Sequence, residues 1–364
     1  MSYIERIAQS CRTQELAREE LAYYARHILL PGIGLEGQRK LKSARVLVVG
    51  AGGLGCPALQ ALAGAGVGRL TIVDADTVDA SNLARQWLHR YDQCGSNKAH
   101  SAATALRQMN PHIEVSARAT MLAEDNAHAL IGAHDIVLDA TDDLNVRYCI
   151  DRACAELDKP WIHAALYRES AQLTVFWAAY GSSFHQLYPE PSAAPSCSGA
   201  GMLGASSSVV GNLQTLECIK LIVGQSDPAL GQVGVFDSRR LSWQFFRLPD
   251  VTLPPRWGPP PEKSHGSSVS AEQLQQAISV GEPIELLDIR DGAAYQAGSL
   301  DGARHYPAER ILEAGLPESG EPMQLLICEE GLVSAMLVDA LAGRASAKLA
   351  YLRGGLHGWR HLVG

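Results

Sequence analysis

The chain has 364 residues, 46% of them hydrophobic and 19% charged, which is the composition of an ordinary globular protein of two or three domains. Its formal net charge of −8, without any cluster of Lys and Arg, argues against a nucleic-acid surface. No apolar run approaches the roughly 18 residues that span a bilayer, and the N-terminus does not read as a signal peptide. We therefore expect a cytoplasmic protein with neither a nucleic-acid nor a membrane partner.

Three parts follow one another along the chain. Residues up to about 42 have helical spacing, and residues from 44 to about 248 alternate apolar strands with helices, which is typical of an α/β fold with a mostly parallel sheet. The Pro-, Gly- and Ser-rich segment 249–268 favours an extended spacer. We predict a domain over 1–248, this linker, which would let the second part travel, and a small α/β domain over 269–364.

The expected strands are short apolar runs between turn-forming residues. In the first domain they are residues 46–49, 70–73, 136–139, 161–164, 173–177, 233–236 and 241–246, of which the last two look like an antiparallel pair. In the second domain they are residues 284–288, 325–328 and 348–352.

A glycine-rich loop follows the first of these strands and opens an apolar helix; it consists of Gly50, Gly52, Gly53, Leu54 and Gly55, with Ala51 between the first two. Such a loop lets backbone amides at a helix N-terminus approach a phosphate. Asp74 ends the next strand, where a carboxylate can hold a ribose hydroxyl. By itself this pattern also describes a nicotinamide-dependent oxidoreductase.

A polar cluster after the second strand favours a different chemistry; its members are Asp76, Asn82, Arg85, Gln86 and Lys98. Hydride transfer needs no such set of cationic and amide groups. Attack on the α-phosphate of ATP does, because fixed cations stabilise the charge that builds on the phosphoryl oxygens. Asp142 follows another buried strand at the same sheet edge and is a candidate Mg²⁺ ligand, while Asp143 beside it is either a further site residue or a helix cap.

These motifs together resemble the ThiF/MoeB branch of the ubiquitin-activating-enzyme superfamily over about residues 21–248. The shared features are G-x-G-G-L-G, D-x-D, S-N-L-x-R-Q, the downstream lysine and D-A-T-D-D. The resemblance implies that Asp74 holds the ribose, that Asn82, Arg85 and Lys98 meet the phosphates, and that Asp142 holds the metal. It also implies a homodimer in which Arg26 reaches the ATP of the other subunit.

The substrate that the resemblance implies is a ubiquitin-like sulfur-carrier protein ending in Gly-Gly, whose carboxylate attacks ATP and becomes an acyl-adenylate. Members of this family often hold a structural zinc ion through two C-x-x-C pairs. The corresponding segments here, 183–186 and 249–258, contain no cysteine, and His185 alone reads as a surface residue. We therefore predict that zinc is absent.

Two cysteines are candidates for sulfur chemistry. Cys197 lies in a Gly- and Ser-rich loop before an apolar helix, a position that by itself favours a buried bystander. The resemblance to the family's catalytic-cysteine pattern, P/N-x-C-x-x-x-G, reverses this and favours catalysis. Cys328 ends a strand and is followed by Gly331 and Ser334, which resembles the rhodanese pattern C-x-x-G-x-x-S/T over about residues 269–364. A loop of this kind can wrap backbone amides around a sulfur anion.

Glu329 and Glu330 depart from the basic loops of many rhodaneses and should repel thiosulfate, so a protein persulfide, as from a cysteine desulfurase, fits better. We predict adenylation of the carrier, followed by sulfur transfer through a Cys328 persulfide to give a thiocarboxylate. Cys197 either forms a thioester or resolves an acyl-disulfide. The alternatives are an adenylating enzyme with a non-catalytic rhodanese module and, more remotely, an NAD-dependent oxidoreductase.

Overall fold

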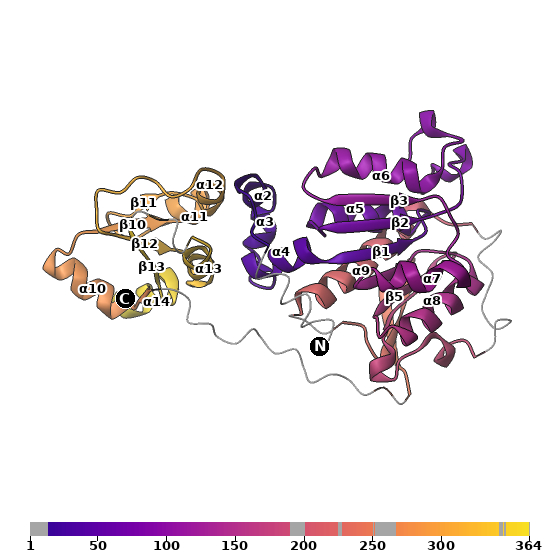
Figure 1. Ribbon diagram of the computed structural model, residues 1–364. Coiled ribbons are helices and arrows are strands. Elements are labelled where there is room, and N and C mark those ends of the chain that lie inside the picture. The colour runs from indigo at the N-terminus through magenta and orange to yellow at the C-terminus, as the bar shows by residue number, and fades with distance from the viewer. Residues whose placement is uncertain are drawn as a thin grey trace. The chain divides into compact units, whose positions relative to one another are not determined.

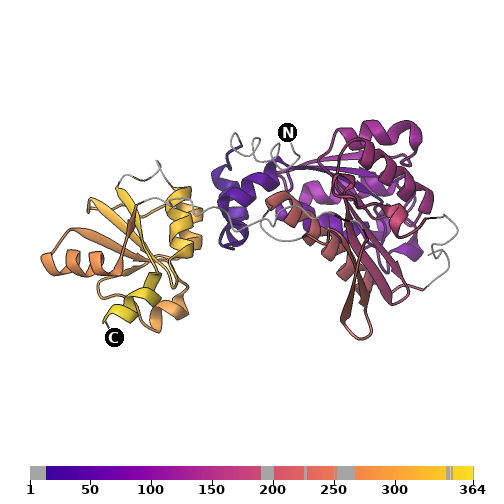
Figure 2. The same ribbon diagram turned by 90° about the horizontal axis from the view of Figure 1, so that it is seen from below.

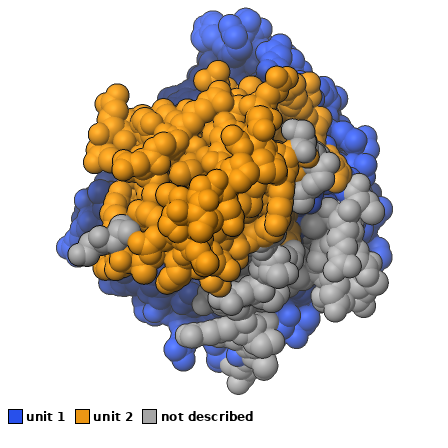
Figure 3. All heavy atoms as spheres, turned by 90° about the vertical axis from the view of Figure 1, so that its left-hand side faces the viewer, with its two compact units in different colours: residues 1–14, 39–258 blue, residues 15–38, 259–364 orange. Residues whose placement is uncertain are grey.

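The computed structural model describes residues 14–189, 201–224, 228–249, 251, 267–341, 345 and 347–363. The chain forms two compact units, which Figure 3 colours separately: residues 1–14 with 39–258, and residues 15–38 with 259–364. The segment 15–38 thus groups with the C-terminal part of the chain, although the sequence favoured a boundary in the linker alone. None of the described helices is long and apolar enough to cross a membrane.

The first unit is built on an eight-stranded sheet in the order β3-β2-β1-β4-β5-β6-β7-β8 (Figure 1). The strands from β3 to β5 are parallel, and those from β5 to β8 are antiparallel. They are β1 (Arg45–Val49), β2 (Arg69–Val73), β3 (Glu114–Arg118), β4 (Ile136–Asp139), β5 (Trp161–Tyr167), β6 (Ser170–Phe176), β7 (Gln232–Asp237) and β8 (Ser242–Arg247).

Helices cover both faces of the parallel half, which is why β1 and β4 are buried on both sides and read as continuous apolar runs (Figure 2). The helices of this unit are α4 (Gly34–Ser43, whose first residues belong to the second unit), α5 (Gly55–Ala65), α6 (Lys98–Met109), α7 (Glu124–Gly132), α8 (Leu144–Glu156) and α9 (Gly204–Val223). Short 3₁₀ turns lie at Ala80–Asn82, Tyr91–Gln93, Ala178–Tyr180 and Phe184–Gln186.

The second unit holds a five-stranded parallel sheet in the order β11-β10-β12-β13-β9. Its strands are β9 (Ser268–Val269), β10 (Ile284–Asp288), β11 (Arg304–His305), β12 (Met323–Ile327) and β13 (Lys348–Leu352). Its helices are α2 (Arg18–Tyr23), α3 (Ala25–Ile28), α10 (Ala271–Val280), α11 (Gly292–Gln296), α12 (Ala308–Ala314), α13 (Leu332–Ala340) and α14 (Gly355–Val363).

The helices α2 and α3 pack on this second sheet's helical layer. Ala25 belongs to the apolar cluster that contains Ile311 of α12 and Leu341, and Leu29 packs against the same cluster. Arg26 forms an ion pair of 2.8 Å with Glu309 of α12. The N-terminal helices are therefore integrated into the C-terminal unit by apolar and charged contacts.

The predicted α/β class is confirmed, and each expected strand is present with its ends shifted by a few residues at most. The expected antiparallel pair is β7 and β8. Three strands were not predicted: the sheet-edge strand β3, whose sequence EVSAR is only weakly apolar, and the two-residue strands β9 and β11. Short or polar edge strands carry too little periodicity to be recognised from sequence.

Candidate active site

A pocket of about 560 Å³ lies at the carboxyl ends of β1, β2 and β4, the sheet edge where ligands bind in open α/β folds. Most of the residues that the sequence singled out meet there. Those lining the pocket are Gly50, Gly52, Gly53, Leu54, Asp74, Asp76, Asn82, Arg85, Gln86, Lys98 and Asp142.

The glycine loop depends on two of its glycines for close backbone approach. Gly50 has φ of +100°, and a Cβ there would lie 2.6 Å from the carbonyl oxygen of Ala140. Gly55 does not line the pocket; a Cβ at this position would lie 2.1 Å from the Gly50 carbonyl oxygen. Gly50 and Gly55 thus let the loop turn tightly into α5, so that the helix N-terminus faces the pocket.

Asp74 follows β2 and anchors the glycine loop by accepting hydrogen bonds from backbone N–H groups. Its Oδ2 accepts the N–H of Ala51 at 2.7 Å and its Oδ1 accepts the N–H of Asp76 at 2.8 Å. A carboxylate has about four lone-pair sites, so Asp74 keeps the capacity to accept a further hydroxyl.

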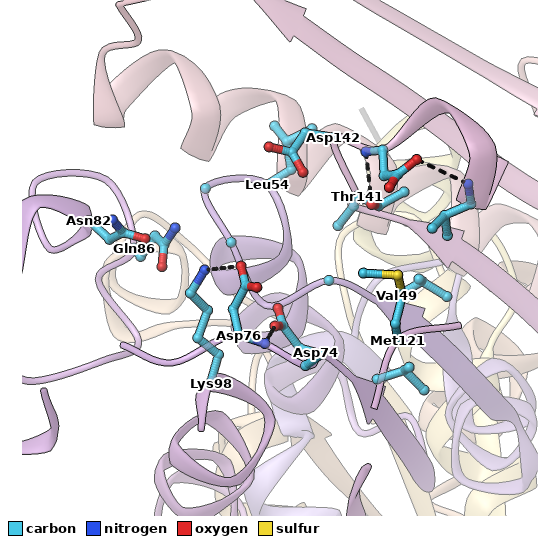
Figure 4. A pocket seen from close by; sticks show the side chains of 18 of the residues that line it. Val49, Leu54, Asp74, Asp76, Asn82, Gln86, Lys98, Met121, Thr141 and Asp142 are labelled. Carbon is cyan, nitrogen blue, oxygen red and sulfur yellow. Dashed lines mark hydrogen bonds and ion pairs between the residues drawn. The ribbon is translucent and has the colours of Figure 1, made fainter. Parts of the chain in front are cut away.

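Lys98 is the first residue of α6, and its side chain is only 8% exposed. Its Nζ forms an ion pair of 2.8 Å with Oδ2 of Asp76, whose side chain is 71% exposed. Figure 4 shows this pair on one side of the pocket and Asp142 across from it. An ammonium group and a helix N-terminus together make an anion-binding corner.

The 3₁₀ turn Ala80–Asn82 presents the amide and guanidinium groups. The Asn82 carbonyl accepts the backbone N–H groups of both Arg85 and Gln86, which fixes the three residues in one turn. Gln86 is 3% exposed, and its Oε1 has no hydrogen-bond partner within the described part of the chain. An acceptor buried at a pocket wall without a partner fits a ligand that brings a donor.

The loop with Asp142 follows β4. Asp143 is the N-cap of α8, because its carboxylate accepts the N–H of Asn145 at 2.7 Å, and it also lines the pocket, so the cap and the site interpretation are compatible. Asp142 itself is exposed at the pocket. Carboxylate oxygens beside phosphate positions are what Mg²⁺ prefers, so Asp142 fits a metal ligand.

Some lining residues were missed from the sequence. Thr120, Met121 and Leu122 follow β3 and were missed because that strand was missed. Arg147 lines the pocket from α8 and donates from Nε to Asp139 Oδ2 at 3.1 Å. The signal for Arg147 was its place in the helix after D-A-T-D-D, but only the fold shows that it turns back to Asp139.

Two buried side chains support the loop from behind. His89 Nε2 lies 2.9 Å from the Ala51 carbonyl oxygen and its Nδ1 lies 2.8 Å from Ser101 Oγ. Burial lowers the pKa of His89, so its ring is neutral. Burial raises the pKa of the Cys56 thiol to about 12, which makes Cys56 an inert core residue.

Cys328 follows β12 in the second unit and sits in a cradle of donors. Its Sγ accepts the backbone N–H groups of Gly331 at 3.2 Å and Ser334 at 3.4 Å, and Ser334 Oγ lies at 3.3 Å. These groups belong to the loop and first turn of α13, so the helix N-terminus faces the sulfur. The arrangement suits a sulfur anion.

The two glutamates of this loop are placed differently. The carboxylate of Glu329 accepts hydrogen bonds from Arg290, at 2.7 Å, and from Arg360, while Glu330 is exposed. The negative charge of Glu329 is therefore compensated by two guanidinium groups.

Two further predicted site residues are not found at the pocket, and the zinc prediction concerns a separate segment. Arg26 is in the second unit, paired with Glu309. Cys197 lies outside the described residues. At 183–186, where a zinc pair would fall, the structure has a 3₁₀ turn in which Gln186 Nε2 donates to the Pro249 carbonyl at 3.1 Å. His185 is exposed, and the absence of zinc stays a prediction.

Comparisons with known proteins agree with this architecture. The model of the ThiF family matches residues 24–252, and that of the rhodanese-like domain matches residues 270–362. The chain is 34% identical over 369 residues to the probable adenylyltransferase/sulfurtransferase MoeZ of Mycobacterium tuberculosis (strain ATCC 25618 / H37Rv), covering 94% of both proteins. It is 34% identical over 381 residues to the adenylyltransferase and sulfurtransferase MOCS3 of Drosophila sechellia, covering 95% of this chain and 84% of that one.

Solved structures share the fold. PaaA superposes with a TM-score of 0.58 at 21% identity, covering 66% of this chain and 76% of that chain. Escherichia coli MccB, solved with AMPCPP and MccA, gives a TM-score of 0.55 at 23% identity, covering 63% and 73%. By its two matched domains and its near full-length relatives, the chain belongs to the ThiF family, carries a C-terminal rhodanese-like domain, and is an adenylyltransferase and sulfurtransferase.

Proposed function

We propose that the protein uses Mg²⁺ and ATP to adenylate the C-terminal Gly-Gly carboxylate of a ubiquitin-like sulfur carrier and then converts it to a thiocarboxylate. The observation that carries this proposal is that Lys98, Arg85 and Asp142 line one pocket together with the glycine loop. A hydride-transfer site would leave these charged groups unexplained.

We place ATP in this pocket with its phosphates toward the glycine loop. The N-terminus of α5 would face the phosphates, Asp74 would accept a ribose hydroxyl, and Asn82, Arg85 and Lys98 would bind phosphate oxygens. Asp142 would hold Mg²⁺, which would neutralise phosphate charge. The family resemblance adds Arg26 of the other subunit of a homodimer.

Adenylation then proceeds by in-line displacement. A carboxylate oxygen of the carrier attacks the α-phosphorus, a new O–P bond forms, and the bond to pyrophosphate breaks with its electron pair leaving on pyrophosphate. Arg85 and Lys98 stabilise the charge that develops on the phosphoryl oxygens.

Sulfur transfer uses the cradle at Cys328. A protein persulfide, as from a cysteine desulfurase, would transfer its terminal sulfur to Cys328 by thiol–persulfide exchange. The terminal sulfur then attacks the acyl carbon and AMP leaves, which gives a carrier–Cys328 acyl-disulfide. If Cys197 attacks Cys328 Sγ, the thiocarboxylate is released and a Cys197–Cys328 disulfide remains for an external dithiol to reduce. If Cys197 instead forms a thioester first, the persulfide sulfur attacks its acyl carbon and the Cys197 thiolate leaves. This gives the same acyl-disulfide, which the freed Cys197 thiolate then resolves in the same way. These steps need free thiols, which suits the cytoplasm.

Two measurements test the proposal. Enzyme, Mg-ATP and a Gly-Gly-tailed carrier should exchange labelled pyrophosphate into ATP; no exchange with any such carrier would overturn adenylation. Cys328→Ala should keep this exchange and lose the thiocarboxylate, read by mass spectrometry of the carrier. An unchanged thiocarboxylate yield would show instead that the rhodanese-like domain is not catalytic.

A further inference from the structure

His163 is a fully buried histidine on β5. It is the register partner of Asp139, the last residue of β4, which precedes the loop that carries Asp142. It is 0% exposed, and its Nδ1 lies 2.9 Å from Oδ2 of Asp139, at the end of β4. Burial lowers the pKa of His163, so the ring is neutral and donates its Nδ1–H to the carboxylate.

The environment of the other ring nitrogen argues that packing alone does not explain a histidine at this position. Trp161, Phe176 and Phe184 surround the ring with centroids at 5.2 to 6.0 Å, and Nε2 finds no hydrogen-bond partner among the residues that the structure describes. A buried polar atom without a partner is destabilising, because it has lost its hydrogen bonds to water. A leucine would occupy a similar volume without this cost, so we look for the role of His163 in its hydrogen bond to Asp139.

The hydrogen bond from His163 helps to orient the Asp139 carboxylate. Oδ2 accepts from His163 and from Arg147 Nε, at 2.9 and 3.1 Å, on two different elements, and Oδ1 accepts the N–H of Thr141 at 3.0 Å. The χ2 torsion of aspartate has no sharp intrinsic preference. Without the donor on β5, Arg147 alone would hold Oδ2 and the carboxylate plane could turn away from Thr141.

The orientation of Asp139 in turn fixes the pocket wall. Thr141 is held at its N–H by Asp139 and at its carbonyl oxygen by Arg147 Nη2, at 2.6 Å. Asp142 is the next residue, and both Arg147 and Asp142 line the pocket. The buried set of Asp139, Arg147 and His163 therefore sets the position of the two charged groups on this wall.

We propose that His163 is a positioning residue for the metal-bound nucleotide: by orienting Asp139 it holds Asp142 and Arg147 where Mg²⁺ and phosphate bind. This inference rests on the proposed function. Groups that hydrogen-bond a metal ligand directly typically contribute 10- to 100-fold to metal affinity, and since His163 acts through Asp139 we expect an effect at the low end of this range.

The test measures ATP binding directly, by calorimetry, with Mg²⁺ and with a chelator, and compares the ratio of the two dissociation constants. In His163→Leu we expect Mg²⁺ to lose about tenfold of its contribution to ATP affinity. His134 supplies a matched control: it is also buried, bonds Leu130 and Thr71, and lies before the amino end of β4. His134→Leu should keep the wild-type ratio even where it lowers stability.

A folded His163→Leu protein with the wild-type ratio overturns the inference and leaves the proposed function intact. If the wild-type protein itself binds ATP equally with and without Mg²⁺, the metal role of Asp142 fails and the inference fails with it. Should His163→Leu not fold, His163→Asn, whose amide nitrogen can take the place of Nδ1 and still donate to Asp139, is compared with the longer His163→Gln. Only the Gln variant should lose the Mg²⁺ contribution, and equal ratios in both overturn the inference.

Discussion

Lys98 occupies a position where its own helix disfavours its charge. It is the first residue of α6, and the N-terminus of a helix carries partial positive charge. Asp76 compensates in the structure, through the 2.8 Å ion pair. A cation at this place becomes favourable when an anion joins it, so the location of Lys98 is itself an argument for phosphate binding.

Lys98→Ala should therefore lower the turnover of pyrophosphate exchange by about 100-fold or more, the usual cost of removing one group that stabilises transition-state charge. Steady-state kinetics with varied ATP measures this loss. Arg90→Ala is the control, because Arg90 is an exposed cation on the neighbouring turn, paired with Asp92. Activity of Arg90→Ala should stay within about twofold; a comparable loss in both variants would mean that general electrostatics, not position, matters.

Most pocket residues could be predicted because they follow the carboxyl ends of parallel strands, and those ends meet at one edge of the sheet. Arg147 and His163 could not. Their importance comes from a shared partner, Asp139, and the pairing joins α8, β4 and β5. Nothing in the local sequence distinguishes a histidine that faces Asp139 from one that merely fills the core.

At the scale of elements, the Cys328 loop is held by the start of α14. A Cβ on Gly355 would lie 2.4 Å from the Cys328 carbonyl oxygen, and one on Gly331 would lie 2.9 Å from the Gly354 N. The Cys328 carbonyl also accepts the N–H of Leu356 at 2.9 Å. The close backbone packing of Gly354 and Gly355 against the sulfur loop appears only in the fold.

Acid should weaken the ion pairs that Glu329, the residue after Cys328, makes with Arg290 and with Arg360 of α14. Burial alone would raise the pKa of Glu329, but the hydrogen bonds from Arg290 and Arg360 outweigh it and the pKa lies below its ordinary value. A group with a lowered pKa stabilises the fold above its unfolded pKa, and that contribution is lost as pH falls through the folded pKa. Glu329→Gln should lower the unfolding temperature at pH 7 by a few degrees at most, since Glu329 is 46% exposed.

The difference in unfolding temperature between wild type and Glu329→Gln should then shrink as the pH is lowered below about 4. There the carboxyl of the unfolded chain is already protonated, and the folded carboxyl, with its lower pKa, follows at still lower pH. Scanning calorimetry across this range follows the transition. Glu330→Gln is the control and should show no such trend. A difference that persists unchanged at low pH would mean that Glu329 acts through packing instead of charge.

At the scale of the whole molecule, the chain passes between its two units more than once. It passes between residues 14 and 15, inside α4 between residues 38 and 39, and between residues 258 and 259. The linker predicted over 249–268 is therefore not the sole tether of the sulfur-transferring unit. The sequence could not show this, because the apolar contacts of Ala25 and Leu29 involve residues near the other end of the chain.

Cutting the chain between residues 252 and 266, at an inserted protease site, should leave the two fragments together. The N-terminal fragment keeps α2 and α3, whose contacts to the C-terminal unit are non-covalent. Size-exclusion chromatography after cleavage checks this. Leu29→Glu should release the C-terminal fragment, whereas Leu30→Glu should not, since Leu30 is 54% exposed. Separation of the unsubstituted fragments would contradict the prediction.

The docking of α2 and α3 also sets the order of events during synthesis. These helices leave the ribosome well before the α12 and α13 residues that share an apolar cluster with Ala25. At about 5–20 residues per second, translation separates the two by an interval on the order of tens of seconds. Throughout that interval the apolar side of α2 and α3 waits uncovered, so chaperone demand should fall on this segment of the nascent chain.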